Sequence, residues 1–446
     1  VRLNGVVAAF TGGALVLVTM IVGLVPAASA LKAGAEGAAS VTGRTTEGRG
    51  GGRLRDALTV VEIALAVVLL VSAGLTARSL MGLLRVDLGF TTHRILAFKT
   101  NLTPQGYPDA AHANRFYENL TARLESLPGV TAVGAVSYLP LSGEAQYVSA
   151  AKVEDASGAE VEVPATEVGW RVVRGQYFEA MKMTLLRGRL FSTADREGAP
   201  PVVIVDDAFA RRFWQTEEAA LGQHIRFGGA TNAELRTVVG VVRAVKHFGP
   251  AATTLPEAYA PQAQVYQRGM YSVVQANGPL AELPPLIRAK LAEVDSSVPM
   301  YFTGTLEQRR RTALTLPRFT AGLIGAFSVL ALVLAGVGIF GVTAYSVGQR
   351  TREFGIRFSL GAQRSHVAGL VLKRVGWLAL LGVALGIPAA LGVARLMASL
   401  LFGVTPADLP TLAITAAGIS LTLSAASIVP ILRALRVDPM EALRAE

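Results

Sequence analysis

Long apolar runs alternate with polar segments along this chain. Five stretches of about 20 residues carry very few charged side chains. A helix needs roughly 20 consecutive apolar residues to cross the hydrocarbon layer of a bilayer. The pattern therefore predicts about five transmembrane helices, at residues 6–25, 57–84, 321–346, 375–394 and 409–432.

The region between the second and third apolar runs has shorter periods, which are typical of an α+β domain. Its beginning predicts a strand, a helix and a strand, at residues 95–100, 110–127 and 130–136. The same order recurs near its end, at residues 271–275, 280–294 and 299–302. Two β-α-β halves fit a ferredoxin-like layer.

Residues 168–240 add further strands and a helix at 206–214, and we expect them to form an inserted lobe. The predicted fold class is thus a membrane α-helical bundle of about five transmembrane helices with a large extracytoplasmic α+β domain.

Lysine and arginine placement predicts the orientation. Basic residues crowd three segments, at residues 32–55, 350–374 and 433–444. Such segments lie on the cytoplasmic side, so the large polar region is expected outside. One cluster contradicts this rule, because the outer end of the third run carries Arg309, Arg310, Arg311 and Arg318.

Composition supports a membrane protein and argues against nucleic-acid binding. The chain is 51% hydrophobic and only 17% charged, with a net charge of +10. Residues 85–317 are almost neutral, with 24 basic and 23 acidic residues, so the excess lies beside the apolar runs. A nucleic-acid-binding protein would concentrate it on a polar domain. The chain has no cysteine, which excludes disulfides and thiolate sites.

A partial internal repeat suggests the domain organisation. Residues 15–34 resemble residues 421–443, since in both a last apolar run leads through Val-Pro into a basic exit. Internal repeats are common in membrane transport proteins. We expect five parts: the last transmembrane helix of a preceding unit (1–31), a cytoplasmic Gly/Arg linker (32–55), a transmembrane helix (56–84), the outer domain (85–317), and a membrane domain with three helices and a cytoplasmic tail (318–446).

No pattern in the sequence indicates catalysis. The 446 residues contain no Walker A, GxSxG or HExxH sequence, and the five histidines are scattered without metal-ligand spacing. We therefore expect no enzyme activity, no cofactor and no metal site in this chain.

Glycines in the apolar runs are better explained by helix packing than by nucleotide binding. Gly336, Gly338 and Gly341 match GxGxxG, but they lie inside a predicted membrane helix rather than after a strand. Gly382 and Gly386 form a GxxxG pair in the next run. Small residues at this spacing let membrane helices approach closely.

One carboxylate lies inside an apolar run. Glu62 falls about one turn from the predicted cytoplasmic end of the second run. An ionisable residue in a membrane helix is a functional candidate, although snorkelling to the interface or pairing with Arg55 explains it as well.

The polar stretch at residues 349–361 (QRTREFGIRFSLG) is the most informative. Phe354 and Phe358 are four residues apart, with Ile356 and Leu360 adding apolar area among charged side chains. A short amphipathic helix of this kind either lies on the membrane surface or fills a groove on a cytoplasmic partner. The residues alone favour neither.

This stretch also carries a resemblance to a known family. Residues 352–362 (REFGIRFSLGA) resemble the REIGIRMALGA signature of FtsX-like permeases, the membrane subunits of MacB-type ABC transporters. The tail at 436–444 resembles their usual exit, and the outer domain resembles the MacB periplasmic core at 127–130, 203–213 and 239–242. The partial repeat makes the chain similar to duplicated orphan permeases that lack most of their first unit.

The resemblance implies an inner-membrane permease that works with three kinds of partner. A separate ABC ATPase docks on a coupling helix, a second permease unit completes the bundle as a homodimer or as the missing first half, and a periplasmic protein binds the outer domain. The coupling residues would be Arg352, Glu353, Phe354, Gly355, Ile356, Arg357, Phe358, Leu360 and Gly361.

Two functions follow from the resemblance. In the first, ATP hydrolysed in trans moves the outer domain and expels a substrate. In the second, the same movement activates an envelope enzyme or reports a ligand, without transport. The sequence does not identify the substrate.

Overall fold

The computed structural model describes residues 12–13, 49–144, 151–155, 158–164, 166–227, 234–359 and 363–435. The predicted first transmembrane helix, most of the linker and the tail beyond residue 435 lie outside these ranges, as do the side chains of residues 49–52, Arg352 and Phe358. The chain forms two compact units, Val1–Ser79 with Thr320–Glu446, and Leu80–Phe319.

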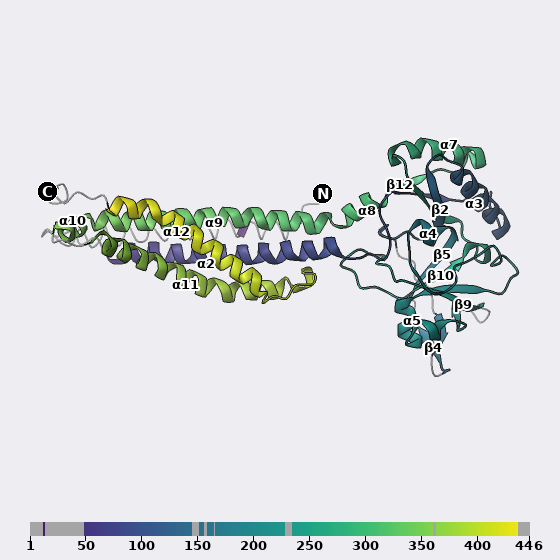
Figure 1. The fold of residues 1–446 in the computed structure, drawn as a ribbon, viewed down its shortest axis with the longest axis horizontal. Helices are drawn as coiled ribbons and strands as arrows, with labels where there is room; N and C mark the ends of the chain where they lie inside the picture. The colour runs from purple at the N-terminus through teal and green to yellow at the C-terminus, as the bar shows by residue number, and fades with distance from the viewer. Residues whose placement is uncertain are drawn as a thin grey trace. The chain divides into compact units, whose positions relative to one another are not determined.

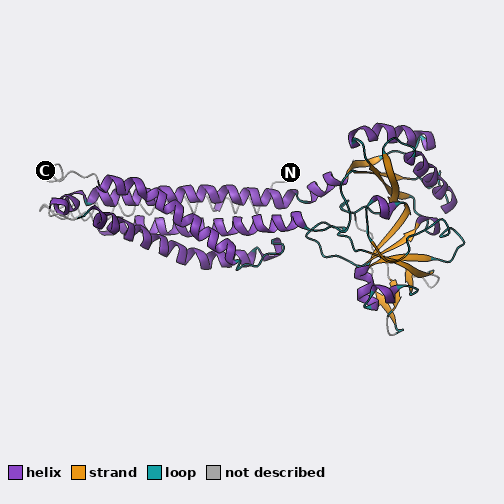
Figure 2. Cartoon of the chain, viewed as in Figure 1, coloured by secondary structure: helices purple, strands orange, loops and turns teal. Residues whose placement is uncertain are grey.

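The first unit is built from helices (Figures 1 and 2). Its described helices are α2 (Arg49–Arg85), α9 (Thr315–Gln349), α10 (Thr351–Ser359), α11 (Arg364–Leu396), η3 (Ala398–Leu400) and α12 (Leu409–Leu435). Four of them, α2, α9, α11 and α12, are long and apolar enough to cross a membrane. They coincide with four of the five predicted runs.

Helix α2 is the central helix of this bundle. In the most apolar 18-residue segment of α2, 44% of the residues are buried, whereas the corresponding share in the other three helices is 22% to 28%. One face of α2 repeats every four residues, which matches the helical period. That face carries Ile63, Val67, Val71 and Leu75, all buried in one core with residues of α9, α11 and α12.

The second unit contains a sheet whose first part has the predicted ferredoxin-like topology. Strands β1 (Ile95–Asn101), β2 (Val130–Val136), β11 (Gly269–Ala276) and β12 (Tyr301–Thr305) are antiparallel neighbours in the order β12-β1-β11-β2. Helices α3 (Ala110–Glu125) and α7 (Leu283–Asp295) contribute to one core on this layer (Figure 1). The two predicted β-α-β halves are confirmed.

Element ends differ slightly from the prediction. Helix α3 stops at Glu125 because Ser126 caps it and Pro128 cannot continue a helix. The second predicted helix begins as a 3-10 turn, η2 (Leu280–Glu282), before α7. The last strand starts at Tyr301 rather than at residue 299.

The inserted lobe continues the same sheet instead of forming a separate one. All twelve strands of the described chain belong to a single sheet, which continues from β2 in the order β5-β10-β7-β9-β8-β3-β4, with β6 on β9. Its strands are β3 (Ala151–Glu154), β4 (Glu160–Val163), β5 (Gly169–Gly175), β6 (Leu185–Gly188), β7 (Val202–Asp206), β8 (His224–Phe227), β9 (Leu235–Val242) and β10 (Glu257–Pro261).

The segments between these strands also form short helices. They are α4 (Tyr177–Ala180), α5 (Asp207–Trp214), α6 (Glu217–Ala220) and η1 (Gln262–Gln264). Asp206 caps α5, accepting a 2.7 Å hydrogen bond from the backbone N–H of Phe209. The buried rings of Phe209 and Trp214 then pack in the lobe core.

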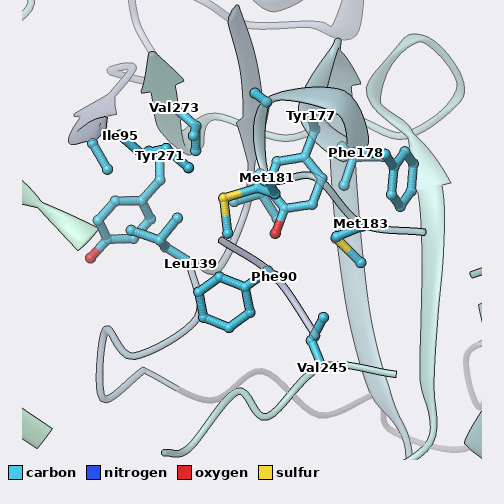
Figure 3. Close-up of a cluster of buried hydrophobic side chains, with 14 of the residues drawn as sticks. Phe90, Ile95, Leu139, Tyr177, Phe178, Met181, Met183, Val245, Tyr271 and Val273 are labelled. Atoms are coloured by element: carbon cyan, nitrogen blue, oxygen red, sulfur yellow. The ribbon is translucent and has the colours of Figure 1, made fainter. Parts of the chain in front are cut away.

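A further core contains both segments that connect the sheet to the membrane helices. Leu88 and Phe90 follow α2, and Leu306 begins α8 (Leu306–Ala313); all three are buried with Tyr177, Met181 and Val273 (Figure 3 shows part of this cluster). Two polar contacts join the same segments. Thr92 donates to Glu307 at 2.9 Å, and Arg310 donates to the carbonyl of Leu84 at 2.9 Å.

Candidate functional site

Helix α10 carries most of the predicted coupling residues. It follows α9 after a single residue, Arg350, and the Thr351 hydroxyl donates to the carbonyls of Val347 and Gly348 at 3.1 and 3.0 Å. The backbone N–H of Phe354 donates to the carbonyl of Arg350 at 2.9 Å. Leu360 and Gly361 lie outside the described residues.

Phe354 fixes α10 to the end of the helical bundle. Its side chain is only 1% exposed and packs in a small core with Val347 of α9, Val367 and Val371 of α11, and Ala434 of α12. Gly355 is buried as well. A buried aromatic side chain is worth about 3–5 kcal/mol when truncated to alanine, so this contact holds the short helix firmly.

The opposite side of α10 is free within the described chain. Ile356 is 42% exposed, and Arg357 is exposed beside it. Glu353 lies 2.6 Å from Arg357 and 3.9 Å from Arg350. Exposed ion pairs of this kind contribute little to stability, but they hold the charged side chains in position around Ile356.

Polar contacts between distant segments tie the helices together near α10. Arg374 of α11 binds Asp56 of α2 through two contacts of 3.0 Å and donates to the Ser346 hydroxyl of α9 at 2.9 Å. The guanidinium of Arg55 lies 4.1 Å from the centre of the Tyr345 ring. No local sequence pattern indicates these contacts, because Asp56 and Arg374 are 318 positions apart.

The glycines differ in what surrounds them. A Cβ built on Gly382 would lie 2.5 Å from Cγ2 of Ile63, and one on Gly386 would lie 2.6 Å from Cβ of Val67. Both glycines therefore lie at the contact between α11 and α2. A Cβ on Gly336 would make ordinary contacts with α12, and one on Gly341 would meet no described atom within 4 Å.

Glu62 lies beside Gly338 on the outside of the bundle. A Cβ on Gly338 would collide with its carboxylate. Glu62 itself is exposed, and among the described residues it has no hydrogen bond or ion pair. An exposed carboxylate on a membrane helix is expected to need a partner, and the described part of the chain does not supply one.

The α+β unit holds a buried polar cluster that is unsuited to catalysis. Arg171 lies 3.2 Å from Glu257, and His247 lies 3.8 Å from the other oxygen of the same carboxylate. Burial raises the pKa of Glu257 to about 7, while Arg171 opposes the shift. All three side chains are buried, so no substrate reaches them. No group of metal ligands occurs among the residues that the structure describes.

A cleft of about 790 Å³ opens in the sheet domain, between the ferredoxin-like layer and the inserted lobe. Helix α3 forms one wall, the loop 190–197 forms the other, and η1 contributes to the lining. Arg174 lines the cleft and donates to Gln262 at 2.9 Å, with Glu118 at 3.9 Å. Carboxylates at Glu125, Glu179 and Glu197 add negative charge.

Comparison with known proteins identifies both units. The family model of the MacB-like periplasmic core domain matches residues 57–299, more than half of the chain, and that of the FtsX-like permease C-terminal domain matches residues 325–439. The fold and these matches define a multi-pass membrane permease with a large periplasmic-type domain. The chain belongs to the FtsX-like permeases that carry a MacB-like periplasmic core.

Individual relatives have export in their names. A "Probable export ATP-binding/permease protein MacB" of Pseudomonas entomophila is 25% identical over 88% of this chain and 56% of its own length. A "Macrolide export ATP-binding/permease protein MacB 1/2" of Paracoccus denitrificans is 30% identical over 63% of this chain and 42% of its own. The chain thus spans about half the length of these relatives.

Solved structures also share similarity with part of this chain. The crystal structure of the periplasmic region of MacB from Actinobacillus actinomycetemcomitans is 14% identical, covers 51% of this chain and 95% of its own, and has a TM-score of 0.34.

Proposed function

We propose that this chain is the permease part of a MacB/FtsX-type ABC transporter, in which ATP hydrolysis outside these 446 residues moves the α+β domain to export a substrate. The observation that carries the proposal is helix α10, which Phe354 anchors in the bundle while Ile356 and Arg357 remain exposed. An apolar side chain framed by charges suits a groove on a cytoplasmic ATPase.

Force on α10 has a continuous route through the bundle. Phe354 contacts residues of α9, α11 and α12 in one packed core, and packed cores pass displacements on because they compress little. The Arg374–Asp56 contact adds α2 to the same group. A push on α10 therefore displaces the ends of all four long helices together.

Two of these helices are covalently continuous with segments of the α+β unit. Helix α2 leads into Leu88 and Phe90, while α9 follows α8 and Leu306, and these residues share one core. The Thr92–Glu307 and Arg310–Leu84 contacts clamp the two segments to each other. Movement of either helix is thereby transmitted to the sheet as a whole. The acidic cleft beside α3 is where we expect a substrate or a periplasmic partner to bind.

The test is a binding and ATPase assay with the exposed face of α10 altered. Ile356→Asp with Arg357→Glu is expected to abolish both the binding of a purified ABC ATPase, identified by its P-loop sequence, and the stimulation of its ATP hydrolysis. Arg288→Glu, on the exposed face of α7, is the matched control and should leave both intact. Full ATPase stimulation by the α10 variant would show that the docking assignment is wrong.

A further inference from the structure

Four arginines lie where the α+β domain passes into helix α9, on the side where the orientation rule expects few. Arg309, Arg310 and Arg311 belong to α8, and Arg318 lies in the first turn of α9. Glu307 is the one acidic residue between Leu306 and Phe319. The export function proposed above gives these charges no role.

Two of the four arginines are held by the domain itself. Arg309 donates to the carbonyl of Phe302 at 2.7 Å, and its guanidinium lies 5.5 Å from the centre of the Tyr271 ring. Arg310 donates to the carbonyl of Leu84 at 2.9 Å. Both side chains join parts of the domain, and this explains their presence.

The other two arginines of this cluster, Arg311 and Arg318, are exposed and have few polar contacts within the described chain. Arg311 has a side chain that is 68% exposed, with a single 3.3 Å contact to Glu307. Arg318 is exposed, and within the described chain its side chain has no hydrogen bond or ion pair. The same holds for Arg85, the last residue of α2. Because Arg310 binds the carbonyl of Leu84, Arg85 lies next to α8.

Large apolar side chains are exposed beside these three arginines. Leu316 is 73% exposed and Phe319 is 65% exposed, and Leu84 and Met81 also face outward. Helix α9 then continues directly into a segment apolar enough to cross a membrane. Exposed apolar and aromatic side chains mixed with guanidinium groups are typical of the bilayer interface, where arginine binds phosphate and the rings enter the acyl boundary.

We propose that Arg85, Arg311 and Arg318 form a binding surface for the phosphate groups of anionic phospholipids at the outer end of α2 and α9. Guanidinium groups hydrogen-bond phosphate strongly through their paired N–H donors. A lipid explains the apolar neighbours, which a soluble anion does not. Bound headgroups would fix the position at which the export domain leaves the membrane.

The test measures lipid binding by the full 446-residue chain in an uncharged detergent and compares the wild type with two variants. A fluorescent phosphatidylglycerol is titrated into the wild type and into the triple variant Arg85→Gln, Arg311→Gln and Arg318→Gln. The matched control replaces three basic residues of the α+β domain, Arg115→Gln, Lys182→Gln and Arg288→Gln, whose side chains are also exposed and have no hydrogen bond or ion pair within the described chain. Fluorescent phosphatidylcholine measures the headgroup preference, and gel filtration confirms that each variant is folded.

The expected result is a roughly 10- to 100-fold loss of phosphatidylglycerol affinity in the triple variant, since each arginine near an anionic surface contributes a few-fold, with the control unchanged. Equal affinity in the wild type and the triple variant would refute the proposal, and so would equal losses in the triple variant and the control. Wild type that binds phosphatidylcholine equally well would also overturn it. Inorganic phosphate that displaces the lipid at equal concentration would mean a small-anion site instead.

Discussion

Most of the largest fully buried side chains belong to the α+β unit, whereas many large apolar side chains of the helical unit lie outside. Phe98, Phe209, Trp214 and Tyr259 are all buried in the sheet domain. Leu396, Ile414 and Leu421 of the bundle are each more than 70% exposed. The two units are built for different solvents: apolar burial drives the folding of one, while the other relies on close helix packing in lipid.

Removing one ring from the α+β core tests most directly whether apolar burial stabilises this unit. Phe209→Ala should destabilise the domain by about 3–5 kcal/mol, because Phe209 is fully buried between the sheet and the rings of Phe213 and Trp214. Denaturant unfolding followed by tryptophan fluorescence measures it. Leu396→Ala, on the exposed side of α11, is the control and should change little. A loss below 1 kcal/mol for Phe209→Ala would contradict the assigned core.

The pH dependence of stability should separate the two units, because among the described residues buried carboxylates occur only in the sheet domain. Burial raises the pKa of Glu257 to about 7, above its value in the unfolded chain. The folded state therefore binds this proton more tightly, and the stability so gained is complete below pH 4.5 and lost as pH rises through 7. The loss amounts to at most about 3 kcal/mol.

Glu257→Gln tests this assignment. Glutamine is neutral at every pH, as protonated Glu257 is, so the variant lacks the proton that Glu257 releases. Its unfolding free energy should therefore fall less steeply between pH 6 and 8 than that of the wild type. Burial lowers the pKa of His247. Protonation of this histidine in the unfolded chain therefore lowers the unfolding free energy as pH falls below 6.5, which opposes the effect of Glu257. The effect of Glu257 is clearest above that pH. Parallel curves for variant and wild type would refute the role of Glu257.

A third prediction concerns helix contact in the bundle. Gly386→Val should destabilise the helical unit by about 1–3 kcal/mol, because even a Cβ at Gly386 would meet Val67 at 2.6 Å and push α11 away from α2. Gly392→Val on the same helix is the control, since a Cβ there would meet no described atom within 4 Å. Thermal unfolding in detergent compares them. Equal melting temperatures would mean that close approach at Gly386 is unimportant.

Sequence patterns predicted the parts that depend on local periodicity. The apolar runs of α2, α9, α11 and α12 and the two β-α-β halves follow directly from it. The single twelve-stranded sheet could not be predicted, because its junction is a parallel pair of β5 with β10. Strand β10 is buried at all five positions, without alternation, and ends in Pro261.

The same limit applies to α10, the helix that carries the predicted coupling residues. Its residues stand out because Phe354 and Phe358 are four positions apart, but that spacing is identical for a face that docks on a partner and for one that packs inward. The burial of Phe354 depends on Val367, Val371 and Ala434, which no local pattern connects with it. The role of the coupling residues and of Glu62 stays a prediction.

The smallest expected effect comes from a helix end in the water-facing unit. Gln215 follows α5 with φ of 68°, a left-handed conformation that glycine adopts without the steric cost of a Cβ. Gln215→Gly should therefore raise the unfolding free energy of the sheet domain by about 0.5–1 kcal/mol. Glu218→Gly, in the nearby helix α6, is the control and should lower it, because glycine disfavours a helix. Denaturant midpoints distinguish the two, and a destabilising Gln215→Gly would show that the side chain contributes more than its backbone conformation costs.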